Sequence, residues 1–212
     1  LNLWKVFRWK VKQTFLSHVQ HNTKNHLFLM KQTKIKSYAK LNLALNVIGK
    51  NSSLHKIESL VAFASLHDEI FIKKINSKSH NISFSGKFSQ NISKHNTISK
   101  LFKILEKKKL LKNRKFKVKI KKQIPNKAGL GGGSMNAASI FKYFIKKKII
   151  NISKKEFIKI SKLIGSDVIL GFNCTNTILN SSNKIRYFNN CKKYYVLIVK
   201  PNFGCSTKEI YS

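Results

Sequence analysis

Acidic side chains are the scarcest chemistry in this sequence. The 212 residues include only 7 Asp and Glu against 43 Lys and Arg, which gives a formal net charge of +36. A reaction that needs a carboxylate must therefore draw on very few candidates, and only two of them are aspartates. The seven acids are Glu58, Asp68, Glu69, Glu106, Glu156, Asp167 and Glu209.

Cysteine is also rare, and long apolar runs are missing. The three cysteines, Cys174, Cys191 and Cys205, form no Cys-x-x-Cys pair, and an odd number argues against a closed disulfide framework. No segment approaches the roughly 20 consecutive apolar residues that a membrane-spanning helix needs. We therefore expect a soluble protein of the reducing cytoplasm, without a membrane partner.

The excess of positive charge raises the alternative of a basic nucleic-acid-binding module. However, the basic residues are spread along the whole chain, and Asn, Ile and Phe are frequent alongside Lys. AT-rich codons encode these four residue types, so genome composition accounts for much of the charge. We expect no nucleic-acid partner, and this module stays the less favoured alternative.

Glycine is concentrated in one stretch. Residues Pro125 to Ala138 read Pro-Asn-Lys-Ala-Gly-Leu-Gly-Gly-Gly-Ser-Met-Asn-Ala-Ala and hold four of the nine glycines. Residues without a Cβ let the backbone take positive φ and approach an anion closely. The residues that follow the glycines predict the first turn of a helix, whose free N–H groups and dipole favour negative charge. The stretch therefore predicts a phosphate-binding loop.

Two common nucleotide loops do not fit this stretch. The P-loop needs Lys followed by Ser or Thr directly after its last glycine, whereas Gly133 is followed by Ser134 and Met135. The dinucleotide-binding fingerprint needs a third glycine at the position that Ser134 occupies. The loop is thus neither a Walker A loop nor a Rossmann loop.

Hydrophobic patterning around the loop predicts an α+β domain with a mixed sheet. Alternating apolar residues predict strands at 34–48, 57–64, 70–75, 81–85, 116–120, 177–180 and 194–200, with a connection near His67 and Asp68. Helices are predicted at 96–107 with Asn96 as N-cap, from the glycines to about Lys147, and from a Ser153-x-x-Glu156 capping box to about Ile164, before Gly165.

Both ends of the chain stand apart from this domain, which we place at residues 30–200. Residues 1–29 form a basic extension without any acid, and their interrupted apolar stretches argue against a signal peptide. The composition of residues 1–29 is compatible with a transit segment or with translated sequence upstream of a start at Met30. We favour the second interpretation and expect this extension to be disordered or not native. Residues 201–212 begin a second domain, in which Ser206-x-x-Glu209 announces a further helix. We expect a truncated chain that is inactive alone.

The motifs resemble those of one kinase family. Residues 125–137 fit Pro-x-x-x-Gly-Leu-Gly-x-Gly-Ser-x-x-Ala, the second motif of the GHMP kinases. Residues 37–45 and 165–168 resemble two further segments of one branch, which uses ATP to phosphorylate a cytidine diphosphate derivative of methylerythritol in isoprenoid biosynthesis. The resemblance implies the family's N-terminal domain: a mixed sheet with helices packed on it and a left-handed βαβ unit around the loop, as in some ribosomal proteins.

This resemblance also implies roles for individual residues. ATP and Mg²⁺ are the expected cofactors, with Ser134 a candidate ligand of the metal. Asp167 would accept the proton of the substrate hydroxyl, and Lys40 would pair with Asp167. The residues expected to bind ATP are Pro125, Asn126, Lys127, Ala128, Gly129, Leu130, Gly131, Gly132, Gly133, Ser134 and Met135.

The substrate would be a small molecule held by Asn42 and His55. The family branch carries Gly-Tyr-His where this chain has Ser53-Leu54-His55, so the aromatic partner for cytosine is absent at Leu54. This departure keeps open another GHMP kinase, of the homoserine or mevalonate type.

Overall fold

The computed structural model describes residues 4–10, 32–50, 55–180, 184–188 and 194–201. Their elements are, in chain order, β1 (Trp4–Lys10), β2 (Thr33–Lys50), β3 (His55–Ile75), β4 (Asn81–Ser85), α1 (Thr97–Lys107), β5 (Lys115–Lys121), α2 (Gly132–Lys146), α3 (Lys154–Ile164), the 3₁₀ helix η1 (Ser166–Phe172), β6 (Thr177–Leu179), β7 (Ile185–Tyr187) and β8 (Tyr195–Pro201).

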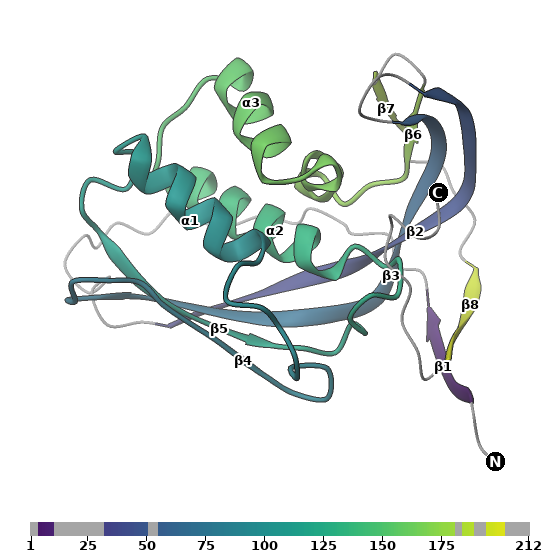
Figure 1. The fold of residues 1–212 in the computed structure, drawn as a ribbon, viewed down its shortest axis with the longest axis horizontal. Helices are drawn as coiled ribbons and strands as arrows, with labels where there is room; N and C mark the ends of the chain where they lie inside the picture. The colour runs from purple at the N-terminus through teal and green to yellow at the C-terminus, as the bar shows by residue number, and fades with distance from the viewer. Residues whose placement is uncertain (1–3, 11–31, 51–54, 181–183, 189–193, 202–212) are drawn as a thin grey trace, which may run out of the picture.

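Six strands form one mixed sheet. Its order is β4-β5-β3-β6-β7, and β2 pairs along the other side of β3. The β4–β5 pair is parallel, with α1 as its crossover, and the other pairs in this sheet are antiparallel. Helices α1 and α2 lie side by side over one face of the sheet (Figure 1). The predicted α+β fold with a mixed sheet is therefore confirmed.

The core forms where α1 and α2 meet this sheet. In α1 the buried residues are Ile98, Leu101, Phe102 and Leu105, which is the spacing that places side chains on one helix face. Asn96 caps the helix, because its side chain accepts hydrogen bonds from the Ile98 and Ser99 backbone N–H groups at 2.9 and 3.0 Å. The predicted helix and its cap are confirmed.

One predicted connection is wrong. The chain does not turn near His67 and Asp68, because β3 runs without a break from His55 to Ile75. Polar residues in an apolar pattern suggested a turn, but the Asp68 side chain is fully buried and accepts hydrogen bonds from segments more than fifty residues away in sequence. The pattern of neighbouring residues cannot reveal hydrogen-bond partners that lie so far away in the sequence.

Other differences concern short or terminal segments. In the extension at residues 1–29, Trp4–Lys10 form β1, which pairs antiparallel with β8. The short strand β7 was not predicted. Helix α3 begins as expected, with Ser153 accepting a hydrogen bond from the Glu156 N–H at 3.2 Å. The Glu156 carboxylate, however, pairs with Lys108 at 2.6 Å. The second domain expected at 201–212 lies almost wholly outside the described residues.

Irregular pairing around β3 makes room for the glycine loop. Strand β5 pairs with β3 from Glu69 to Ile75, and β6 pairs with it only at residues 59–61. On the other side of β3, the register of the β2–β3 pair shifts between Tyr38 and Lys40. Irregularities of this kind, such as β-bulges, are common beside functional sites. The loop that follows β5 therefore lies beside a stretch of β3 that neither β5 nor β6 covers.

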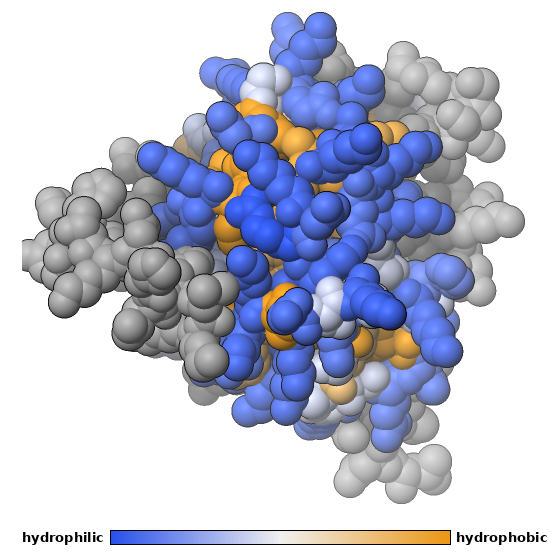
Figure 2. All heavy atoms as spheres, turned by 90° about the vertical axis from the view of Figure 1, so that its left-hand side faces the viewer, coloured by the Kyte–Doolittle hydropathy of each residue, from blue (hydrophilic) through white to orange (hydrophobic). Residues whose placement is uncertain are grey.

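Polar side chains dominate the side of the molecule that Figure 2 presents. Figure 2 shows hydrophilic side chains covering most of one side of the molecule, with only narrow apolar strips between them. Among the described residues no helix is long and apolar enough to cross a membrane.

Candidate active site

The glycine stretch forms a loop from the end of β5 to the start of α2. Gly129 and Gly131 have φ of 70° and 65°, the left-handed region in which residues with a Cβ are strained. Between them the Leu130 side chain is buried in a small cluster with Ala39 and Leu66, which anchors the loop. The N-terminus of α2 directly follows, so the predicted loop-to-helix arrangement is present.

Lys40 lies directly against this loop. Its backbone N–H donates to the Leu130 carbonyl at 3.0 Å, at the point where the β2–β3 register shifts. A Cβ added to Gly131 would lie 3.3 Å from the Lys40 Cβ, so the approach of strand and loop requires glycine there. The Lys40 side chain is 7% exposed, which holds its ammonium group inside the site.

Asp167 reaches the same point from η1. Its Oδ2 lies 3.0 Å from the Lys40 Nζ, and its side chain stays 33% exposed. Helix η1 packs closely on α2, because a Cβ on Gly171 would lie 2.7 Å from the Ala138 Cβ. The structure therefore brings together Lys40, Asp167 and the glycine loop from three separate segments.

Some of the loop residues expected to bind ATP have structural contacts. The Asn126 side chain donates to the Phe88 carbonyl at 2.6 Å and so ties the loop to the β4–α1 connection. The Met135 side chain is buried in the core. Ser134 faces η1, since a Cβ on Gly165 would lie 3.8 Å from its Oγ. Ser134 thus lies on the side of the loop where Asp167 sits.

The two expected substrate contacts lie along the β2–β3 pair. Asn42 follows Lys40 by two residues on β2, and its Oδ1 accepts a hydrogen bond from the Ser59 hydroxyl at 3.3 Å. His55 pairs with Lys50 at the far end of β2, and its side chain lies outside the described residues. Strand register alone does not bring His55 to Lys40, whose partner on β3 is Phe63.

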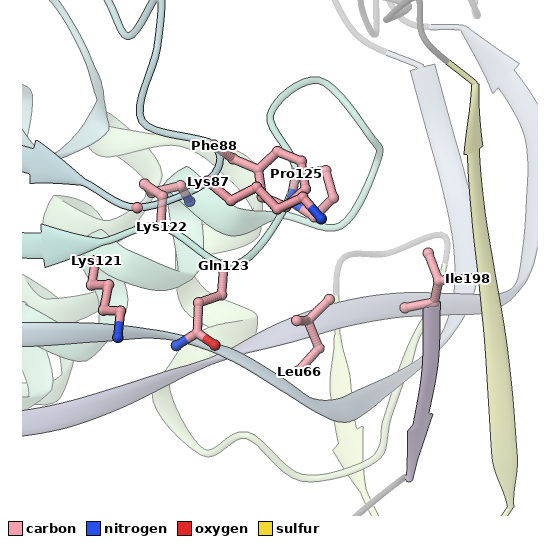
Figure 3. A pocket seen from close by; sticks show the side chains of 9 residues that line it. Leu66, Lys87, Phe88, Lys121, Lys122, Gln123, Pro125 and Ile198 are labelled. Carbon is pink, nitrogen blue, oxygen red and sulfur yellow. The ribbon is translucent and has the colours of Figure 1, made fainter. Parts of the chain in front are cut away.

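A pocket of about 240 Å³ adjoins the start of the glycine loop. Figure 3 shows Phe88 and Pro125 on one side of it and Leu66 and Ile198 on the other. Lys87, Lys121, Lys122 and Gln123 complete most of its lining. Its walls are mainly apolar, which suits a flat uncharged ring. Sequence reasoning missed Phe88, which lies in an irregular connection without a pattern.

A buried polar cluster next to the loop was also not predicted from the sequence. Asp68, Lys122 and Asn136 are each nearly or fully buried and bonded to one another through the Asp68 carboxylate. The only signal was Asp68 between two apolar stretches, a position that the sequence pattern led us to interpret as a connection between strands.

Two other kinds of site find no support among the described residues. They contain no cluster of three or more His, Cys, Asp or Glu side chains that could hold a metal ion alone. Burial raises the pKa of the Cys174 thiol above its ordinary value, and the thiol donates to the Gly171 carbonyl at 3.1 Å. A protonated thiol is a poor nucleophile, which makes the partly buried Cys174 a weak candidate for a reactive group.

Comparison with known proteins places these features in one family. Residues 96–179 match the family model of the GHMP kinases N terminal domain. The chain is 61% identical to the 4-diphosphocytidyl-2-C-methyl-D-erythritol kinase of Pelagibacter ubique, over 86% of this chain and 65% of that protein. It is 32% identical to the enzyme of the same name from Clostridium tetani, over 84% of this chain and 64% of that protein. The chain thus spans slightly less than two thirds of these relatives.

Solved structures share the fold. One is a 4-(cytidine 5'-diphospho)-2C-methyl-D-erythritol kinase, with a TM-score of 0.59 and 21% identity over 74% of this chain and 55% of that one. Another is the mevalonate pyrophosphate decarboxylase of Streptococcus pyogenes, with a TM-score of 0.55 and 13% identity over 73% and 50%. The fold therefore accommodates more than one reaction. Together, the family match, the 61% identical relative and the glycine loop show that this chain carries a GHMP kinase N-terminal domain.

Proposed function

We propose that this chain carries the nucleotide-binding site of a small-molecule kinase, which transfers the γ-phosphoryl group of ATP to the 2-hydroxyl of 4-diphosphocytidyl-2-C-methyl-D-erythritol. The observation that carries the proposal is the Lys40–Asp167 ion pair of 3.0 Å set against the glycine loop. The choice of substrate rests on the name of the relative that is 61% identical. The reaction belongs to isoprenoid precursor biosynthesis, and we place it in the cytoplasm.

The loop would bind the phosphates of ATP. Backbone N–H groups between Gly129 and Ser134 are the donors, and the N-terminus of α2 adds partial positive charge. Positive φ at Gly129 and Gly131 is a backbone conformation that such loops use to direct N–H groups toward an anion. The pocket beside Pro125 would take the adenine ring, since it is largely apolar and borders the loop.

Asp167 would act as the base and Lys40 as its partner. The carboxylate accepts the proton of the substrate hydroxyl while that oxygen forms its bond to the γ-phosphorus and ADP leaves. Lys40 orients the carboxylate through their ion pair, and its ammonium group offsets charge on the transferring phosphoryl group. The 33% exposure of Asp167 leaves it open to an approaching hydroxyl, whereas buried Lys40 is held in place.

Magnesium would reach the site with the nucleotide. Because Mg²⁺ usually takes one or two protein ligands together with phosphates and waters, a single hydroxyl or carboxylate here is compatible with it. Ser134, at the start of α2 and facing η1, is the ligand that we propose. The ion would neutralise phosphate charge during transfer.

Asn42 and His55 would contact the substrate. Asn42 lies on the same strand as Lys40 and, by the alternation of side chains along a strand, on the same face. With Leu54 in place of an aromatic residue, cytosine would be held by other groups.

The test of this mechanism is ADP release by the protein that the complete reading frame encodes. Asp167→Asn should lower kcat by about 10²- to 10⁴-fold, the usual cost of losing a general base, with little change in the KM for ATP. Glu156→Gln is the matched control, since this acid pairs with Lys108 on the neighbouring helix surface and should keep normal turnover. Comparable turnover by wild type and Asp167→Asn would sink the proposed role of Asp167.

A further inference from the structure

Asp68 is a buried acid that the proposed chemistry does not use. Its side chain has no exposure to solvent, although aspartates are almost never fully buried unless they are paired. It lies near the middle of β3, beside the stretch of that strand where the glycine loop packs. Its two carboxylate oxygens have separate sets of partners.

Oδ1 binds the chain that leads into the loop. It accepts hydrogen bonds from the backbone N–H groups of Gln123 and Ile124 at 2.7 and 2.8 Å. These residues directly precede Pro125, where the loop begins. The β3–β5 ladder ends at the pair Glu69–Lys121, so the carboxylate satisfies the N–H groups that the ladder no longer pairs.

Oδ2 binds the other side of the loop. It accepts a hydrogen bond from the Asn136 amide at 2.8 Å, and Asn136 lies early in α2, just after the glycines. It also pairs with the Lys122 ammonium group. One carboxylate is therefore bonded to residues on both sides of the glycine loop.

The Asp68–Lys122 pair also neutralises a buried positive charge near the start of α2. The Lys122 ammonium lies close to the first turn of α2, since a Cβ on Gly132 would be 3.1 Å from its Nζ. A buried cation at the positive end of a helix dipole is unfavourable without a counterion. Asp68 supplies that charge, so the helix N-terminus stays suited to an anionic ligand.

We propose that Asp68 is a positioning residue that holds both ends of the glycine loop in the geometry that binds the nucleotide phosphates. It does not touch the nucleotide itself. The inference rests on the proposed function for its ligand, but the clamp on the loop exists in the chain without nucleotide. Part of the affinity for ATP therefore comes from bonds made beneath the loop before ATP arrives.

The experiment compares three variants of the 212-residue chain. Asn136→Leu cuts the bond on the α2 side and leaves the Asp68–Lys122 pair in place. Thr177→Val is the matched control, because the Thr177 hydroxyl in β6 is buried and donates to the Thr175 carbonyl at 2.7 Å, a bond that involves neither the loop nor Asp68. Asp68→Asn is a third variant, which removes the charge from the clamp.

Two readouts separate positioning from general stability. Amide hydrogen exchange is followed at Lys40 and Met135, whose N–H groups donate to the loop carbonyls of Leu130 and Gly131 at 3.0 and 2.8 Å. Titration calorimetry gives the affinity for ATP. We expect Asn136→Leu to speed exchange at both amides and to weaken ATP binding about tenfold, while Thr177→Val, with a similar loss of overall stability, changes neither.

The outcomes are distinct. Exchange and affinity in Asn136→Leu that match those of Thr177→Val would overturn the positioning role, and so would faster exchange with unchanged affinity. If the wild-type chain itself bound no ATP, the proposed function would fail, and the exchange rates alone would still decide whether the carboxylate holds the loop. If Asp68→Asn does not fold, Asn136→Leu still gives the decision.

Discussion

At the scale of single residues, two glycines in the loop have similar backbones but different surroundings. Gly129 and Gly131 both have φ near +65° to +70°, yet a Cβ on Gly129 would meet nothing within 4 Å, whereas one on Gly131 would press on Lys40. Alanine at either position would have about the same backbone strain, because the two φ angles are similar. The pair therefore isolates the effect of displacing Lys40.

We expect Gly129→Ala to lower the free energy of unfolding by about 1–2 kcal/mol, the cost of a left-handed residue with a Cβ. Gly131→Ala should lower it further and should also reduce kinase turnover, because the added methyl group would shift the ammonium group that orients Asp167. Denaturant unfolding and ADP release measure the two effects. Equal losses of turnover in both variants would show that the contact with Lys40 is unimportant.

Single residues differ in how well the sequence predicts them. Lys40 and Asp167 have no local pattern that sets them apart, and only the resemblance of their segments to a known family singled them out. Their meeting at 3.0 Å agrees with that expectation. Asp68 belongs to no such motif, and its partners lie 54 to 68 residues further along the chain. Its clamp on the loop could not be predicted from neighbouring residues.

At the scale of elements, His80 joins β4, α1 and β5. Its ring lies 4.3 Å from that of Phe102 on α1, and its Nδ1 accepts a hydrogen bond from the Phe116 N–H of β5 at 3.1 Å. Its Nε2 lies 3.1 Å from Glu106. Burial lowers the pKa of His80 below its ordinary value, and nearby Lys115 lowers it too, while Glu106 acts in the opposite direction.

This lowered pKa makes the parallel βαβ unit sensitive to acid. Between the folded and unfolded pKa values of His80, the unfolded chain binds more protons, so stability rises with pH and falls as pH drops below about 6.5. We expect the free energy of unfolding to decrease from pH 6.5 to pH 5, by at most about 1.4 kcal/mol per pH unit from this group. Denaturant titrations at several pH values measure it.

His80→Gln should flatten that decrease, because the buried group that resists protonation is gone. His95→Gln is the control, since His95 is exposed and should leave the pH profile unchanged. A decrease between pH 6.5 and pH 5 that is identical in wild type and His80→Gln would rule out His80 as its source.

The elements themselves were predicted unevenly. Helix α1 and strand β5 follow clear apolar periods with a capping residue or alternating lysines, so local sequence was sufficient. The three-residue strand β7 is too short and exposed to show a period. Strand β3 was divided in two because burial of Asp68 depends on tertiary contacts.

At the scale of the whole molecule, the fold brings the site together from distant parts of the chain. β2 supplies Lys40, the glycine loop lies against it, and η1 supplies Asp167. The six-stranded mixed sheet sets their relative positions, and the close packing of η1 on α2 at Gly171 keeps Asp167 beside the loop. The GHMP kinase fold accounts for this assembly, whereas we propose that the choice of phosphoryl acceptor depends on residues such as Asn42 and His55.

The central claim is therefore tested most directly by the choice of acceptor. ADP release by the protein of the complete reading frame should be measured with 4-diphosphocytidyl-2-C-methyl-D-erythritol, mevalonate and homoserine. We expect kcat/KM for the cytidine derivative to exceed the other two values by at least about 100-fold, because polar groups built for one substrate discriminate strongly against others. An equal or higher kcat/KM for mevalonate or homoserine would contradict the account.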